Sequence, residues 1–168
     1  MIPDQPFIIR LANPGDAEAI AEVHLQSHRE TYPPLVGEQN YWPSSKAERL
    51  AQWQQALAGQ ESGPGIAFVA VAGGRVVGFT HAVGEQITTL YILAAWHRRG
   101  IGRALLTRLC QALAARGIAR ARFAVLAVNA AAIRFYEALG AEPAGSIQIE
   151  EQRIRYEDRL FEIPTGGW

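Results

Sequence analysis

The sequence predicts an α/β fold of the α+β type, with a mixed, mainly antiparallel sheet of about seven strands and helices on both faces. Two observations lead to this prediction. A β-branched and aromatic segment at 87–93 is followed by apolar residues at helical spacing over 101–113, and then by a second apolar segment at 121–128. A helix between two strands of one sheet makes those strands parallel. The other expected strands are joined by short turns, which is typical of antiparallel neighbours.

The first strand and the first helix are expected near the N-terminus. Residues 7–12, FIIRLA, form the strand, and Asn13 or Asp16 in the following turn can cap the helix. Apolar residues at helical spacing continue to about residues 29–31. Tyr32-Pro33-Pro34 follows and ends the helix, because proline has no backbone N–H and clashes with the preceding turn.

A second helix is expected to begin at Ser44 or Ser45 and to end near Leu57. Ser45 and Glu48 have the spacing of a capping box, in which two side chains satisfy the free N–H groups at a helix start. Apolar residues within this segment recur at helical spacing, so one face of the helix should pack on the sheet.

Gly73-Gly74 separates two strands, at 66–72 and 75–83, and the pair predicts a hairpin whose turn needs positive φ. The segment 121–128 is almost continuously apolar, as expected of a strand that is buried on both faces. The last expected elements are a helix over 129–140 and two alternating strands at 147–150 and 153–163.

Residues 97–103, HRRGIGR, join the central strand to the helix that follows it, and we call them the basic loop. The first turn of a helix has N–H groups without intrahelical partners and carries partial positive charge, so phosphate oxygens are natural ligands there. Glycine lets a phosphate approach the backbone without a Cβ in the way. The basic loop therefore predicts a phosphate site.

Two other phosphate-binding motifs are excluded. Gly100-x-Gly102 lacks the third glycine of the dinucleotide fingerprint, and no acidic residue follows about 20 positions later. The glycine, lysine and serine or threonine spacing of a Walker A loop occurs nowhere in the chain.

Three segments together resemble the GNAT superfamily of acetyl-CoA-dependent N-acetyltransferases. They are the strand LYIL at 90–93, the loop RRGIGRALL at 98–106, and NAAAIRFYEALG at 129–140. The resemblance extends from Ile8 to Ile163, and it implies one domain over residues 1–168 with a splayed central parallel pair. His97 departs from the pattern, because the family usually has Gln or Arg there.

The resemblance implies acetyl-CoA as co-substrate and transfer of its acetyl group to a primary amine of a small molecule or a peptide. The amine would attack the thioester directly. Residues that match the family's CoA-binding positions are, for the acetyl end and pantetheine arm, Leu90, Tyr91, Ile92 and Asn129, and, for the diphosphate, Arg98, Arg99, Gly100, Ile101, Gly102 and Arg103.

Tyr136 matches the family tyrosine that protonates the departing thiolate. The base has several candidates. The positions at which family members carry a catalytic glutamate hold Gln86 and Ala124 here, so the hypothesis names Glu85, next to Gln86, as the base and Tyr136 as the acid. Glu30, His81 and a water relay stay open as alternatives.

The resemblance also places an SxRxxY-like segment on the wall of the acceptor pocket, and Ser27, Arg29, Glu30 and Tyr32 match it here. A function of a different class is a non-catalytic acyl-CoA-binding module that senses or scaffolds. The absent glutamates favour the module, and the retained Tyr136 favours the enzyme.

Composition sets further limits. Hydrophobic residues make up 49% and charged residues 19%, which is typical of a globular protein. The 16 Lys and Arg balance 16 Asp and Glu, so nucleic acid is not expected as a partner. No apolar segment approaches the roughly 20 residues that span a bilayer and no signal peptide is recognised, so no membrane partner and a cytoplasmic location are expected.

Cys110 is the only cysteine and lies on the apolar side of its helix, so a buried reduced thiol is expected. His24 and His28 are four residues apart on one helix, but no third ligand has a recognisable spacing. No metal is predicted, and a homodimer is left open.

Overall fold

A computed structural model describes residues 5–151 and 154–168. The strands are β1 (Phe7–Leu11), β2 (Gly65–Ala72), β3 (Arg75–Val83), β4 (Gln86–Ile92), β5 (Arg120–Leu126), β6 (Glu142–Glu151) and β7 (Ile154–Pro164). The α-helices are α1 (Ala17–Thr31), α2 (Pro33–Val36), α3 (Lys46–Ala58), α4 (Ile101–Ala115) and α5 (Ala130–Ala138). Short 3-10 turns are η1 (Pro14–Asp16), η2 (Glu38–Asn40) and η3 (Ala94–Trp96).

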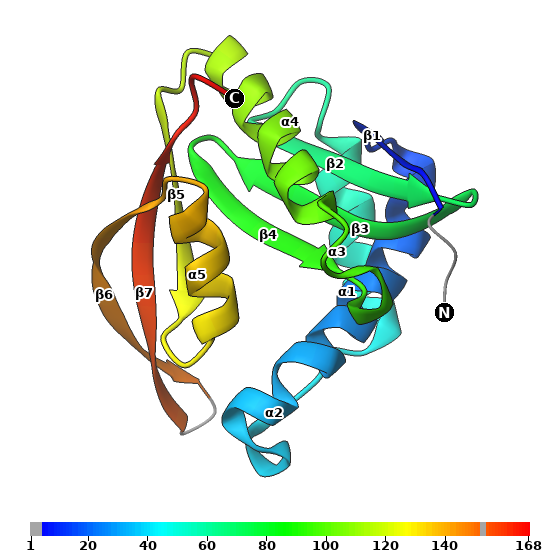
Figure 1. The fold of residues 1–168 in the computed structure, drawn as a ribbon. Helices are drawn as coiled ribbons and strands as arrows, with labels where there is room; N and C mark the ends of the chain where they lie inside the picture. Colours follow the sequence, from blue (N-terminus) through cyan, green and yellow to red (C-terminus); the bar gives the residue numbers. More distant parts are fainter. Residues whose placement is uncertain (1–4, 152–153) are drawn as a thin grey trace.

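The seven strands form one sheet in the order β1-β2-β3-β4-β5-β7-β6. Every described neighbouring pair is antiparallel except β4 and β5, which are parallel. The predicted mixed, mainly antiparallel sheet is therefore confirmed. β4 and β5 are in register only at Gln86 and Arg122, and beyond this point they diverge (Figure 1).

Local sequence signals account for several element boundaries. Asn13 caps η1 and Ser45 caps α3, each through a capping box. Gly73 and Gly74 have φ of 56° and 75°, the left-handed conformation that their hairpin turn needs. Asp16 makes no cap bond to α1, because its carboxylate binds the Arg10 guanidinium instead.

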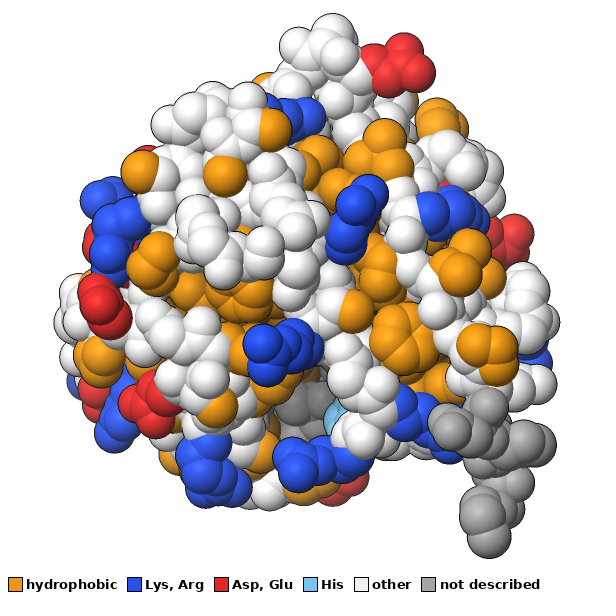
Figure 2. All heavy atoms as spheres, turned by 45° about the horizontal axis from the view of Figure 1, so that its top comes forward, with side chains coloured by type: hydrophobic (Ala, Val, Ile, Leu, Met, Phe, Trp, Pro, Cys, Tyr) orange, Lys and Arg blue, Asp and Glu red, His pale blue; other side chains and the backbone are white. Residues whose placement is uncertain are grey.

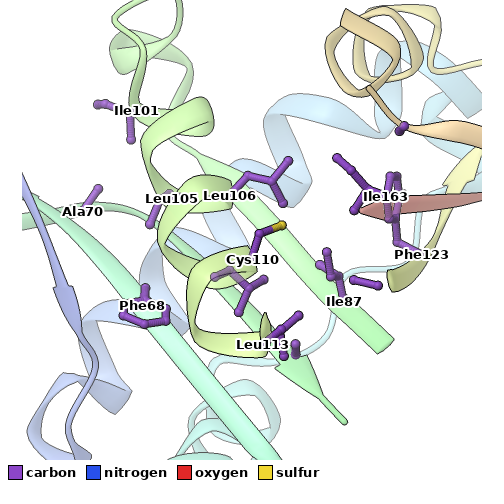
Figure 3. Close-up of a cluster of buried hydrophobic side chains, with 14 of the residues drawn as sticks. Phe68, Ala70, Ile87, Ile101, Leu105, Leu106, Cys110, Leu113, Phe123 and Ile163 are labelled. Atoms are coloured by element: carbon purple, nitrogen blue, oxygen red, sulfur yellow. The ribbon is translucent and has the colours of Figure 1, made fainter. Parts of the chain in front are cut away.

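Two hydrophobic cores lie on opposite faces of the sheet. On one face α4 packs its apolar stripe against β2, β3 and β4, and the same core continues to β5 and β7, as the side chains in Figure 3 show. The other core joins α1 and α3 to β2 and β3, with Trp53 almost completely buried at its centre. Cys110 lies in the first core, and burial raises the pKa of its thiol to about 12, so the predicted buried thiol is confirmed.

The expectation that the strand at 121–128 is buried on both faces is wrong. Ala121, Phe123 and Val125 are buried, whereas Arg122 and Ala124 alternate with them and are exposed. The helices α1 and α3 pack on β2 and β3, and the corresponding face of β5 lines an open cleft. Apolar composition alone could not separate a doubly buried strand from one that borders a cleft.

The surface shows dispersed charge. On the face shown in Figure 2, Lys and Arg side chains lie in small separate groups among apolar and uncharged residues. Within the described part of the chain, no helix is long and apolar enough to cross a membrane.

Candidate active site

The divergence of β4 and β5 opens a cleft of about 1320 Å³. One side of the cleft is formed by the N-terminus of α4 and by α5. The other side is formed by α1, the segment after it, and β7. The two strands themselves supply the floor, so main-chain groups that would otherwise pair across the sheet face the cleft.

The basic loop brings most of its residues to this cleft. Gly100 caps α4 in the left-handed conformation, with φ of 80°, and no side chain accepts a hydrogen bond from the first turn. Arg98 has φ of 63°, which is an uncommon conformation for a residue with a Cβ. The loop residues that line the cleft are Arg98, Gly100, Ile101, Gly102 and Arg103.

Gly102 has a different reason to be glycine from the one expected. A Cβ at this position would lie 3.1 Å from Phe135 Cζ and 3.2 Å from Ile92 Cδ1, so it would point into the packing between α4, α5 and β4. At Gly100 a Cβ would meet no atom within 4 Å, although its positive φ favours glycine. Only Gly100 therefore keeps space open beside the phosphate site.

Arg99 and His97 hold the basic loop in its conformation. The Arg99 guanidinium lies over the Trp96 ring, 4.8 Å from its centroid, and Arg99 is not among the residues that line the cleft. His97 Nε2 lies 2.8 Å from the main-chain oxygen of Ile92. The histidine that departs from the family pattern thus ties the loop to the end of β4.

The end of β4 presents main-chain groups to the cleft. Leu93 N–H donates to Val77 O on β3, so in the antiparallel alternation Tyr91 also pairs towards β3. Leu90 and Ile92 then direct their N–H and C=O groups towards β5, where no residue is in register with them. All three predicted residues line the cleft, and Leu90 leaves its main chain unpaired there.

Tyr136 lines the cleft from within α5, and Asn129 lines it from the N-cap of this helix. Asn129 Oδ1 accepts a hydrogen bond from Ala132 N–H and caps the helix. Tyr136 is partly buried against Phe123, with ring centroids 4.4 Å apart, and both Tyr136 and Asn129 line the cleft. Burial raises the pKa of the Tyr136 phenol, so it stays protonated at neutral pH.

A pair of tyrosines closes the cleft from the other side. The hydroxyls of Tyr32 and Tyr91 lie 3.0 Å apart, and His24 stacks on the Tyr91 ring at 5.0 Å. Burial raises the pKa of both phenols. Of the segment expected to form the acceptor wall, Glu30 and Tyr32 line the cleft, whereas Ser27 is buried and Arg29 is not part of the lining.

The structure does not bring Glu85 to the cleft. It lies before the first residue of β4, at the end where β4 and β5 still pair, and its carboxylate is 3.1 Å from Arg122 Nη1. The Glu30 carboxylate accepts from Ala94 N–H and from Gln26 Nε2. His81 is buried behind Thr88, with Nδ1 2.7 Å from the threonine hydroxyl, and burial lowers its pKa.

The residues that the sequence analysis did not single out include two with chemistry that bears on the acceptor. Asp158 on β7 and Arg49 on α3 both line the cleft. From Ile154 to Leu160 every second side chain of β7 is partly buried, and Asp158 is one of these, together with Tyr156. A carboxylate among the partly buried positions of an alternating strand could have marked Asp158 in the sequence. Nothing in the sequence near Arg49 distinguishes it from an ordinary surface residue of a helix. We call the side chains of Tyr32, Arg49, Tyr91 and Asp158 the polar wall.

A family model matches the sequence, and solved structures match the fold. The model of the acetyltransferase (GNAT) family matches residues 22–141. No curated protein sequence matches the chain. Solved structures share the fold at low identity, as the three that follow show.

PaiA N-acetyltransferase from Thermoplasma acidophilum, in complex with coenzyme A, has a TM-score of 0.75 at 18% identity, over 95% of this chain and 99% of that one. YncA, a putative acetyltransferase from Salmonella typhimurium with acetyl-CoA, has a TM-score of 0.74 at 20% identity, over 97% of this chain and 96% of that one. The ribosomal-protein-S18-alanine N-acetyltransferase of Escherichia coli has a TM-score of 0.67 at 23% identity, over 97% of this chain and 96% of that one.

The splayed parallel pair and the helix N-terminus beside it form the kind of cleft that the GNAT resemblance implies for a coenzyme A thioester. The family match covers more than half of the chain, and the structural matches extend over nearly all of it. The chain belongs to the GNAT acetyltransferase family, and acetyl-CoA is its co-substrate.

Proposed function

We propose that this protein transfers the acetyl group of acetyl-CoA to the primary amine of a small molecule or a peptide, by direct attack of the amine on the thioester. One observation carries the proposal. The first turn of α4, the unpaired main chain of Leu90 and the hydroxyl-bearing side chain of Tyr136 all face the same cleft. These are the groups that a thioester donor needs.

The basic loop would hold the diphosphate. The N–H groups of the first turn of α4 have no side-chain partner, and the helix dipole adds partial positive charge. Arg98 and Arg103 line the same part of the cleft and can add charge-assisted hydrogen bonds. Arg99 is proposed to act indirectly, by fixing the loop against Trp96.

The gap between the diverging strands β4 and β5 would hold the pantetheine arm and the thioester. An arm between β4 and β5 replaces the strand pairing that is missing there, with Leu90 N–H and C=O as partners and Asn129 beside them. An N–H group that faces the thioester oxygen stabilises the negative charge formed during attack. Tyr91 and Ile92 shape this part of the floor.

Tyr136 is proposed as the acid that protonates the departing thiolate. Its raised pKa keeps the phenol protonated, and no described residue hydrogen-bonds its hydroxyl, so the proton can be donated to sulfur. Glu85, the base proposed from the sequence, lies outside the cleft beside Arg122, and it could act only from a distance.

A non-catalytic acyl-CoA-binding module is the second candidate. The absence of Glu85 from the cleft favours it, together with Gln86 and Ala124 at positions where relatives carry a glutamate. Tyr136 favours the enzyme, because a module that only binds acyl-CoA needs no acid beside the sulfur.

Release of the CoA thiol separates the two candidates. Acetyl-CoA is incubated with the protein and a panel of polyamines, aminoglycosides, amino acids and peptides, and free thiol is measured against a control without amine. Amine-dependent thiol release is the expected result. Tight CoA binding by calorimetry without turnover on any amine would favour the binding module.

A further inference from the structure

Resting on the proposed acetyl transfer, we propose that Asp158 is the general base that receives the proton of the acceptor amine. The carboxylate lines the cleft from β7, on the polar wall. No described residue forms an ion pair or a hydrogen bond with it. An acidic side chain kept in a partly buried cleft without a cation is costly unless a ligand uses it.

The strand register places Asp158 on the acceptor side of the sheet. Asp158 is opposite Leu126 on β5, and residues opposite one another in an antiparallel pair share a face. Phe123 and Val125, whose side chains pack towards α4 and α5, alternate with Leu126 and so face the other way. Asp158 therefore lies across the sheet from the core that contacts Tyr136.

Tyr32 links the two groups. Its hydroxyl lies 3.0 Å from that of Tyr91, and it interacts electrostatically with both Asp158 and Tyr136. Acid and base therefore border the same cleft and lie on opposite faces of the sheet. A thioester between the strands needs this arrangement, because the amine attacks on one side of the carbonyl carbon and sulfur departs from it.

The proton balance is complete with these two residues. Asp158 takes one proton from the ammonium and passes it to solvent, and the free amine attacks the carbonyl carbon. The C–N bond forms, the C–S bond breaks, and the Tyr136 hydroxyl gives its proton to sulfur. Asp158 accepts the second proton from nitrogen, and solvent carries it to the Tyr136 phenolate, so each turnover releases one proton, the amide and CoA.

The environment of Asp158 suits this role. Burial raises its pKa above the ordinary value, which makes the carboxylate a better base than one in water. The titratable and charged side chains that line this side of the cleft are, from α1, α3 and the segment between them, His28, Glu30, Tyr32, Tyr41 and Arg49. From the sheet and α5 they are Tyr91, Arg155, Tyr156, Glu157 and Tyr136.

The test is Asp158→Asn, with thiol release measured from pH 5 to pH 9. The wild type should lose kcat/KM as the pH falls through the raised pKa of Asp158. The variant should lose about 10²–10⁴-fold in turnover at neutral pH, as expected for removal of a general base, with that acidic limb absent and CoA affinity kept. Asp158→Glu should recover part of the activity, and Glu150→Gln, a carboxylate outside the cleft lining, should be unchanged.

A stability measurement distinguishes a base from a structural carboxylate. Because burial raises the pKa of Asp158, the native state binds its proton more tightly than the unfolded state, and the charged form is destabilising above that pKa. Asp158→Asn should therefore raise Tm at neutral pH, and the gain should shrink at acidic pH.

If the wild type turns over and Asp158→Asn keeps both the rate and the acidic limb of the pH profile, the assignment of Asp158 as the base is overturned, while the proposed function stands. A lower Tm in the variant would show that the carboxylate is structural and would also overturn this assignment. Absence of wild-type turnover would overturn the proposed function first.

Arg49 carries a second inference, also resting on the proposed function: we propose that the acceptor bears a carboxylate near its amine, as an amino acid does. Arg49 lines the cleft, and no described carboxylate lies within ion-pair distance of it. Its Nη1 donates to Gln52 Oε1 and its Nη2 to Ser44 Oγ, at 2.8 and 2.9 Å, while Nε is buried without a partner. The guanidinium is held in place with its charge not neutralised.

A carboxylate is the ligand that fits such a cation. Each Nη has a second hydrogen beyond those used by Ser44 and Gln52, and a guanidinium presents its donors in the planar geometry that carboxylates accept. The phenols of Tyr41 and Tyr91 lie within electrostatic range of Arg49, so the cation faces the acceptor side of the cleft rather than the basic loop.

Matched acceptors test this inference. kcat/KM is measured for L-phenylalanine and 2-phenylethylamine, and for L-methionine and 3-(methylthio)propylamine, which differ only by the carboxylate. The wild type should have the higher kcat/KM for the amino acid of each pair. Arg49→Gln should reduce the ratio of the two kcat/KM values about tenfold or more. Arg75→Gln, at the exposed start of β3, should leave the preference as it is. Equal use of both members of each pair, or an unchanged preference in Arg49→Gln, would overturn the inference.

Discussion

The two sides of the cleft are built in different ways. The side beneath α4 and α5 uses main-chain groups of residues that are close in sequence, namely the basic loop and the end of β4. The polar wall on the other side uses four side chains from α3, β4, β7 and the end of α1. We infer that the first side recognises the acetyl-CoA donor and that the second selects the acceptor.

This difference separates the expected effects of substitutions. Main-chain recognition is removed only by changing backbone shape or nearby charge, so changes there should act on CoA affinity. Side-chain recognition is removed one residue at a time, so changes in the polar wall should act on the acceptor and on turnover.

Tyr136 is the side chain on the donor side that is proposed to act on the chemistry and not on CoA affinity, and Tyr136→Phe should give the largest effect there. The change removes one hydroxyl and leaves the ring packed on Phe123, so CoA affinity should hardly change. Turnover should fall about 10²–10⁴-fold, the range for a general acid. Steady-state kinetics and calorimetry with CoA measure the two quantities. Intact turnover would mean that the thiolate leaves without help from Tyr136.

Arg98→Ala and Arg103→Ala should give the reverse pattern. Each removes a charge-assisted hydrogen bond worth about 1.5–3 kcal/mol, so CoA should bind roughly tenfold to a hundredfold more weakly. kcat at saturating acetyl-CoA should be nearly unchanged. Arg75→Ala is the matched control, and an equal loss in that variant would point to a general effect of charge.

Gly102→Val should act on stability. A side chain here meets Phe135 and Ile92 at little more than 3 Å, so the core must shift, at a cost of about 1–3 kcal/mol. Urea unfolding measures this loss. Gly100→Val should also lose stability, because its φ of 80° disfavours valine, and it should in addition weaken CoA binding, because its Cβ points into open space beside the proposed phosphate site. Unchanged CoA binding in Gly100→Val would contradict this distinction.

Asp16→Asn should give the smallest effect, on the same side as the polar wall but away from the cleft. Asp16 accepts from both Arg10 Nη atoms and from Asn13 N–H, and these bonds lower its pKa. Their loss should reduce the free energy of unfolding by about 1–2 kcal/mol at neutral pH.

The pH dependence of this effect follows from the lowered pKa. The stabilisation by Asp16 is complete above the unfolded-state pKa of about 4 and is lost as the pH falls through the folded-state pKa. Wild type and Asp16→Asn should therefore converge in acid, while their kinetics with acetyl-CoA stay alike. A stability difference that does not depend on pH would exclude the carboxylate charge as its source.

Most of the fold could be predicted, because it follows from local patterns. The helical spacing of α4, the capping box at Ser45 and the turn at Gly73-Gly74 each report on a few neighbouring residues. The donor side could be proposed for the same reason, since one continuous loop and the end of one strand form most of it.

The acceptor side could not be predicted in this way. Arg49 and Asp158 are far apart in sequence, and only the tertiary fold brings them to one cleft. Glu85 is a candidate from the sequence because it adjoins Gln86, which matches the family's glutamate position, but this adjacency does not show at which end β4 and β5 diverge. The apolar run of β5 predicts burial on both faces, because the sequence does not reveal that a cleft replaces the second helical layer.

A crystal structure with CoA bound tests the central claim most directly, which is that the donor lies between β4 and β5 with its sulfur beside Tyr136. The account predicts diphosphate oxygens within hydrogen-bond distance of the N–H groups of residues 101–103, a pantetheine arm bonded to the main chain of Leu90, and the sulfur near the Tyr136 hydroxyl. CoA bound elsewhere, or lying in the cleft with Tyr136 turned away from the sulfur, would contradict it.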